Sequence, residues 1–106
     1  MEFRPLLRDE IPEALALAWE VFSEFEAPEY PPEGVAQFRE FIRPENLLPE
    51  FDRGDHLFFG AFWDGALAGM LSLRRPDHIS LLFVGKQFHR RGAGTGLFRS
   101  ARTLCP

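Results

Sequence analysis

The sequence contains a single cysteine, a single tyrosine and no apolar run long enough to cross a bilayer. Cys105 has no cysteine to pair with, so an internal disulfide is excluded, and we interpret it as a small apolar side chain near the C-terminus. A membrane-spanning helix needs about 20 consecutive apolar residues. The N-terminus lacks the basic segment and apolar core of a signal peptide. We therefore expect a soluble, cytoplasmic protein without a membrane partner.

Positive charge is also scarce, because 12 basic residues stand against 16 acidic ones and the net charge is −4. The only dense basic cluster is His89-Arg90-Arg91. Three residues are too few to neutralise the phosphates of a nucleic-acid duplex, so we expect no nucleic-acid partner. The cluster is large enough to contact one or two phosphate groups.

The chain has 106 residues, 45 % of them hydrophobic, which predicts one small folded domain over residues 1–106. Twelve phenylalanines predict a core rich in aromatic side chains. A strand, two helices, a three-stranded antiparallel meander and a last helix follow one another along the chain. This order predicts an α+β (mixed α/β) fold.

In the N-terminal half we expect a short strand at residues 2–5 and a helix that begins at an Asp9 cap and ends near Phe25 or Glu26. The proline-rich residues 27–34 predict a loop, and residues 45–54 predict a turn or a single helical turn. A second helix lies between them and ends at Pro44. The apolar positions that predict the two helices are Ile11, Leu15, Ala18, Trp19 and Phe22, and then Val35, Phe38, Phe41 and Ile42.

In the C-terminal half, residues 56–63 and 66–73 predict two strands joined by a hairpin turn at Asp64-Gly65. Residues 74–77 form the next turn, and residues 78–84 form a strand so apolar that we expect it to be covered on both faces and paired on both edges. A loop at residues 85–91 leads to a helix from about Gly92. Its core-facing side chains are expected to be Leu97, Phe98, Ala101 and Leu104.

The residues around Gly92 carry the clearest chemical signal. A buried strand runs into a basic turn, and the turn runs into a helix that starts with glycines at positions 92, 94 and 96. The first N–H groups of a helix lack intrahelical acceptors, and the helix dipole is positive there. Glycines leave these groups uncovered, so the segment predicts a phosphate or pyrophosphate cradle. The lysine of a P-loop and the glycine spacing of a dinucleotide-binding fingerprint are both absent.

This stretch resembles the acetyl-CoA motif of the GNAT superfamily of N-acetyltransferases, Q/R-x-x-G-x-G/A, which follows a strand ending in valine. His89-Arg90-Arg91-Gly92-Ala93-Gly94 matches the motif, with histidine at the Gln/Arg position, and Val84 ends the strand. The element order of the whole chain is similar to the N-terminal portion of that family. The resemblance implies a GNAT-like acyl-CoA N-acyltransferase fold that is truncated after its third main helix.

The resemblance also implies the ligands and the residues that bind them. Acetyl-CoA would be the cosubstrate, with no metal, and the acceptor would be a primary amine on a small molecule or peptide. The strand main chain would pair with the pantetheine arm, the following N–H groups would hold the pyrophosphate, and the loop near Tyr30 would shape the acceptor site. The implied cofactor-binding residues are Leu82, Phe83, Val84, Arg90, Arg91, Gly92, Ala93, Gly94 and Thr95.

No catalytic residue is assigned. The family's general-acid tyrosine lies on a later helix, and Tyr30 does not occupy that position. The acidic and histidine side chains considered as bases are more typical of turns and solvated faces; they are Glu24, Glu26, Glu29, Asp77 and His78. We expect the fourth strand to have an open edge that favours homodimerisation or strand exchange.

Two other functions remain open from the sequence. The chain could be a noncatalytic CoA- or phosphate-binding module completed by another chain, or an inactive fragment without a ligand. The glutamates near Pro28 favour a cationic or amine acceptor, but the sequence does not identify it.

Overall fold

The computed structural model describes the main chain of residues 1–104 and the side chains of residues 1–103. The interpretation of Cys105 and the inward side chain expected for Leu104 therefore lie outside the described residues. None of the helices in residues 1–104 has the length and apolar character needed to cross a membrane.

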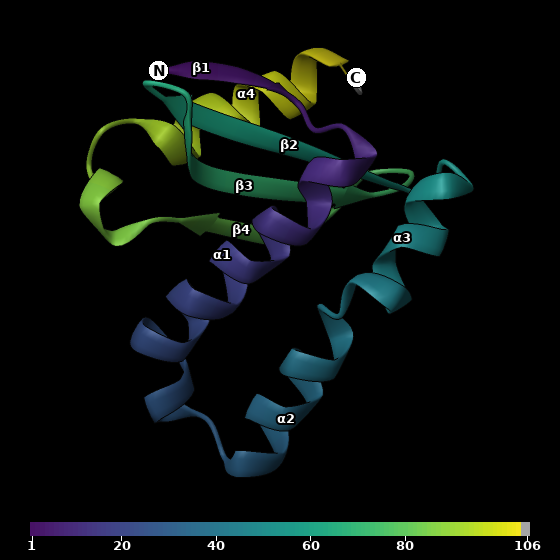
Figure 1. Ribbon diagram of the computed structural model, residues 1–106, viewed down its shortest axis with the longest axis vertical. Coiled ribbons are helices and arrows are strands. Elements are labelled where there is room, and N and C mark those ends of the chain that lie inside the picture. The colour runs from purple at the N-terminus through teal and green to yellow at the C-terminus, as the bar shows by residue number, and fades with distance from the viewer. Residues whose placement is uncertain (105–106) are drawn as a thin grey trace.

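A four-stranded antiparallel sheet, in the order β1-β2-β3-β4, organises the fold (Figure 1). The strands are β1 (Glu2–Pro5), β2 (His56–Trp63), β3 (Ala66–Arg74) and β4 (His78–Val84). Asp64 and Gly65 both have positive φ values, 52° and 81°, as a two-residue hairpin turn requires. The predicted meander and its hairpin are confirmed, and β3 extends one residue further than expected.

Within residues 1–104, four helices lie on the two sides of this sheet. On one side lie α1 (Ile11–Phe25), α2 (Pro32–Phe41) and α3 (Pro44–Asp52), and on the other lies α4 (Ala93–Leu104) (Figure 1). The face under α1 buries Phe22, Phe58 and Phe83 in one cluster, and the face under α4 buries Phe59, Leu71 and Leu97 in another. The predicted α+β class and the aromatic core are confirmed.

The start of α1 differs from the prediction. Arg8–Glu10 form a 3-10 turn before the helix, so Asp9 does not cap it. The side chain of Glu10 caps the main chain before the helix instead, because its Oε1 accepts a hydrogen bond from the Leu7 N–H at 2.8 Å. The predicted end of this helix at Phe25 is confirmed.

The proline-rich segments contain more helix than predicted. Pro32 and Pro44 are the first residues of α2 and α3, a position where the missing N–H of proline costs nothing. The loop before α2 is correspondingly shorter, with a 3-10 turn at Ala27–Glu29. The turn or single helical turn expected at residues 45–54 was wrong in extent: the helix α3 has nine residues, and its buried Leu47 packs in the core.

Two expectations about burial were also wrong. Within residues 1–104, β4 pairs only with β3, and Leu82 is 44 % exposed, so the strand is not enclosed on both edges and faces. Phe98 is 41 % exposed on α4 rather than in the core. Leu97 and Ala101 are buried as predicted, because they lie on the side of α4 that faces β2 and β3.

Candidate anion-binding site

The loop between β4 and α4 presents a run of unpaired main-chain N–H groups. The first hydrogen bond of the helix joins the Gly96 N–H to the Gly92 carbonyl at 2.9 Å, so Gly92 caps α4. In the part of the chain that the structure describes, no N–H of residues 90–95 donates to a protein acceptor. These donors and the positive end of the α4 dipole favour an anion.

A hollow of about 280 Å³ lies at this point. Residues from the end of β4, the loop and the first turn of α4 line it: Val84, Phe88, His89, Arg90, Gly92, Ala93, Gly94 and Thr95. Five of the predicted loop residues therefore meet in one place. The exception is Arg91, whose guanidinium lies over the Trp63 ring at 5.4 Å from its centre.

The three glycines of the motif have two different roles. A Cβ at Gly92 or Gly94 would meet no heavy atom within 4 Å, so these positions leave open space in front of the amides. Gly92 also has a φ of +79°, which favours glycine. A Cβ at Gly96 would lie 2.0 Å from the Phe3 ring. Gly96 therefore allows α4 to pack on β1, and its predicted role in exposing amides was wrong.

His89 connects the loop to the strand before it. Its Nε2 donates a hydrogen bond to the Val84 carbonyl at 2.9 Å, and its ring lies 5.3 Å from that of Phe25 on α1. Because a carbonyl can only accept, the proton is on Nε2. The histidine at the motif's Gln/Arg position thus supports the geometry of the loop from an exposed site.

The open edge of β4 presents alternate main-chain groups. The Gly85 N–H donates to the Ala68 carbonyl on the β3 side at 2.7 Å, and Phe83 pairs opposite Met70 in the same register. Alternation in an antiparallel ladder then directs the N–H and C=O groups of Leu82 and Val84 away from β3. Leu82 and Val84 are free to pair with an added extended chain, whereas the main chain of Phe83 faces β3.

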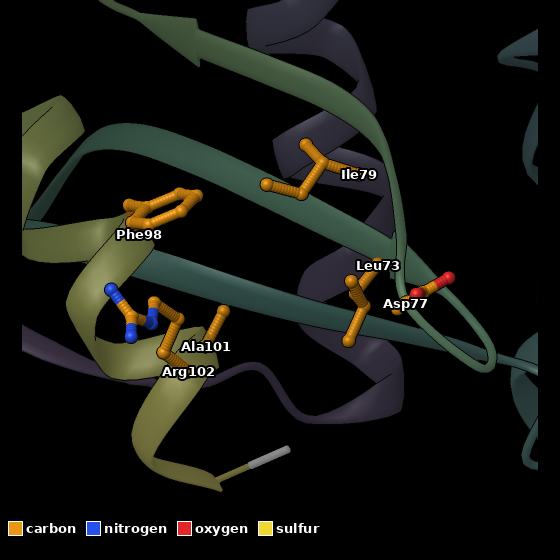
Figure 2. Close-up of a pocket in the computed structure, with 6 residues that line it drawn as sticks. All are labelled: Leu73, Asp77, Ile79, Phe98, Ala101 and Arg102. Carbon is orange, nitrogen blue, oxygen red and sulfur yellow. The ribbon is translucent and has the colours of Figure 1, made fainter. Parts of the chain in front are cut away.

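The residues considered as bases are not gathered at this hollow. Glu24 forms an ion pair with Lys86 at 3.1 Å. Asp77 lies at the edge of a separate, largely apolar hollow of about 230 Å³ between the strands and α4, which Figure 2 shows with Phe98 and Arg102. Tyr30 is 49 % exposed and packs edge-on against Phe22. None of the five residues considered as bases lines the hollow at the loop, and neither does Tyr30.

Sequence reasoning missed a polar cluster beneath α3. His56 is fully buried, yet its Nδ1 lies 3.2 Å from Glu50 and its Nε2 lies 2.7 Å from the Ser80 hydroxyl. Burial lowers the pKa of His56, and the nearby Glu50 carboxylate only partly opposes this effect. The signal in the sequence was a histidine and two serines on apolar strands, which are costly there unless hydrogen-bonded.

The comparisons with known proteins agree with this geometry. The profile of the acetyltransferase (GNAT) domain matches residues 26–106, and the chain belongs to this family of acetyltransferases. Its fold is the GNAT acyl-CoA N-acyltransferase fold. No curated relative matches the chain in sequence.

Solved structures show the same architecture. PaiA N-acetyltransferase from Thermoplasma acidophilum, in complex with coenzyme A, is 26 % identical with a TM-score of 0.82 over 98 % of this chain and 70 % of its own. A GCN5-related N-acetyltransferase from Rhodopseudomonas palustris is 24 % identical with a TM-score of 0.79 over 98 % of this chain and 64 % of its own. A soil-metagenome aminoglycoside acetyltransferase bound to sisomicin is 17 % identical, with a TM-score of 0.67 over 97 % of this chain and 68 % of its own.

Proposed function

We propose that this chain binds acetyl-CoA and belongs to an N-acetyltransferase that moves the acetyl group to a primary amine. The observation that carries the proposal is the run of unpaired amides at residues 90–95 behind the open space at Gly92 and Gly94. The coenzyme A complex of the Thermoplasma relative supports the choice of ligand.

The pyrophosphate is expected at the N-terminus of α4, where main-chain N–H groups supply most contacts and Arg90 adds charge. The pantetheine arm then runs back along β4 and pairs with the outward main-chain groups of Leu82 and Val84. Since the Val84 carbonyl accepts the His89 bond, its N–H is the group free to pair. Phe83 supports the site through its buried ring rather than through its peptide groups.

In this reaction the amine nitrogen attacks the thioester carbonyl carbon, the C–S bond breaks, and the CoA thiolate takes up a proton. The chain spans 70 % and 64 % of the length of the two relatives described first. The acidic loop between α1 and α2, which includes Glu26 and Glu29, favours a cationic acceptor.

Calorimetry with acetyl-CoA tests the binding part of the proposal. We expect Gly94→Leu to weaken binding by at least about tenfold, equivalent to 1.4 kcal/mol, because its side chain covers the free amides. Gly94→Ala is the matched control, since a Cβ there meets no atom within 4 Å. No heat at millimolar acetyl-CoA, or equal affinities for both variants and the unmodified chain, would overturn the assignment.

A noncatalytic CoA-binding module completed by another chain is the second candidate. The observation that favours it is the edge of β4, which no strand within residues 1–104 covers. Thioester cleavage measured with a panel of amines separates the two functions. Amine-dependent release of CoA thiol supports the enzyme, and binding without such release supports the module.

A further inference from the structure

The polar cluster beneath α3 links a carboxylate, an imidazole and a hydroxyl in series. Glu50 on α3 lies 3.2 Å from His56 Nδ1, and His56 Nε2 lies 2.7 Å from Ser80 Oγ. Ser72 completes the cluster, at 3.0 Å from His56 Nε2 and 2.8 Å from Ser80 Oγ. His56 and Ser72 are fully buried, whereas Ser80 is half-buried on the open-edged strand β4.

The partners of Glu50 determine where the protons lie. Arg74 donates to Glu50 Oε1 through Nε at 3.2 Å and through Nη2 at 3.0 Å. A carboxylate can only accept, so His56 Nδ1 carries the proton and Nε2 is left as an acceptor. The Ser80 hydroxyl is the closer donor to Nε2. Because the Ser80 proton points to His56, Ser72 donates the hydrogen bond between the two serines. Ser80 Oγ is therefore a neutral hydroxyl that donates to His56 and accepts from Ser72.

A bulge in the sheet places Ser80 in this cluster. Leu73 pairs with Ile79 and Ser72 pairs with Leu81, so Ser80 has no partner on β3. An extra residue of this kind redirects its side chain out of the regular alternation. Ser80 consequently joins Leu81 on the face under α1 and α3, where it meets His56.

We propose that Glu50, His56 and Ser80 form an acyl-accepting serine site that hydrolyses activated esters and thioesters, an activity beyond the acetyl transfer proposed above. The three residues have the contacts of a nucleophile, a base and a group that orients the base.

The step balances without any other co-reactant. Ser80 Oγ attacks the acyl carbonyl carbon while its proton passes to His56 Nε2. The bond to the leaving oxygen or sulfur then breaks, and the proton passes to that leaving group. Water, deprotonated by the same imidazole, hydrolyses the acyl-serine to a carboxylic acid and restores the hydroxyl.

The charges around His56 set the pH dependence of this step. Glu50 from α3 favours the protonated ring, and Arg74 from β3 and His78 from β4 oppose it, while burial lowers the pKa of His56 most strongly. The imidazole is therefore a neutral base at pH 7. The acylation rate should rise with pH through the pKa of His56, below the usual 6.5, and then level off.

p-Nitrophenyl acetate tests the proposal on the whole chain. We expect release of nitrophenol and an acetyl group that peptide mass spectrometry assigns to Ser80. Ser80→Ala should abolish labelling there, and His56→Asn should slow nitrophenol release by about a hundredfold or more. Ser100→Ala on α4 is the matched control and should react as the unmodified chain does. No acylation of Ser80, or equal rates for Ser80→Ala and the unmodified chain, would overturn the proposal.

His56→Asn removes a buried side chain and can fail to fold, so a second measurement keeps His56 in place. In Ser80→Cys, with His56 intact, the thiol should react with iodoacetamide faster than the thiol of Ser100→Cys does at pH 7, and Glu50→Gln should reduce this difference. Equal reactivity of the two thiols would contradict the proposal. Neither assay needs CoA, so Gly94→Leu should leave both results unchanged. A failure of the serine-site proposal is therefore distinguishable from a failure of the proposed acetyl-CoA site.

Discussion

His89 Nε2 donates a hydrogen bond to the carbonyl of Val84 at 2.9 Å, across the turn that immediately precedes the unpaired amides of residues 90–95. The bond joins the last residue of β4 to the loop before α4. It occurs at the motif position where the family has glutamine or arginine, so a different donor side chain supports the same loop.

Replacing this histidine should weaken binding without removing the amides. We expect His89→Ala to raise the Kd for acetyl-CoA by roughly two- to tenfold. One hydrogen bond stabilises the binding conformation of the loop by about 1 kcal/mol, and the variant loses it. His89→Gln, which retains a donor, should bind nearly as well as the unmodified chain. Calorimetry measures both, and equal losses in the two variants would show that the bond to Val84 is unimportant.

The two neighbouring glycines of α4 should respond oppositely to alanine. Gly96→Ala places a Cβ 2.0 Å from the Phe3 ring and should lower the free energy of unfolding by about 1–3 kcal/mol. Gly94→Ala meets no atom within 4 Å and should maintain or increase stability, since alanine favours the helix.

Urea denaturation measures the unfolding free energies. Phe3→Leu in the Gly96→Ala background should recover part of the lost stability by making room for the methyl group. If both alanine variants had the same stability, the packing role of Gly96 would be refuted.

Glu10 should contribute to the acid sensitivity of the fold. Hydrogen bonds from Arg4 and from the Leu7 N–H lower its pKa from 4.5 to about 2. A carboxyl with a lowered folded-state pKa stabilises the fold above its unfolded-state pKa, and this contribution is lost as the pH falls from about 5 to about 2. Glu10→Gln should therefore flatten the fall in stability over that range.

Thermal unfolding followed by circular dichroism between pH 6 and pH 2 checks this expectation. Glu13→Gln, which changes an exposed glutamate in the first turn of α1, is the control and should keep the slope. A Glu10→Gln variant with the slope of the unmodified chain would contradict the assignment.

The uncovered edge of β4 should promote self-association. Leu82 is 44 % exposed beside main-chain groups that no strand in residues 1–104 pairs. We expect association at high concentration and less of it in Leu82→Lys, because a charged side chain hinders edge-to-edge pairing. Leu7→Lys changes a more exposed leucine outside the sheet and serves as the control. Light scattering after size-exclusion chromatography that shows a monomer at all concentrations would refute the prediction.

The local signals were sufficient for the strands and for the loop. Asp64-Gly65 predicts its hairpin because both positions tolerate a positive φ, and the apolar segments on either side of this turn predict β2 and β3 within one residue. The prediction failed at α3, because Pro44 starts a helix there instead of only ending one. A proline removes a hydrogen bond in a helix interior, as Pro49 does within α3, but it suits the first turn, where Pro44 lies, and local sequence does not distinguish the two cases.

Long-range packing explains what was missed. Gly96 resembles Gly92 and Gly94 in the sequence, and only the ring of Phe3, some ninety residues earlier, gives it a different role. Nothing in the local sequence distinguishes Ser80 from a surface serine. The bulge on β4 turns its side chain toward His56 and Ser72. Contacts of this kind depend on register and layer order, which no local pattern encodes.

The sequence by itself determined the family, the order of the elements and the position of the uncovered amides at the start of the last helix, because turn chemistry and helix-start chemistry are local. Tertiary structure alone decided which glycine packs and which leaves space, which groups of β4 face outward, and how Glu50, His56 and Ser80 meet. These features require residues far apart in the chain to be brought within hydrogen-bond or van der Waals distance, and only the folded sheet with its covering helices does that.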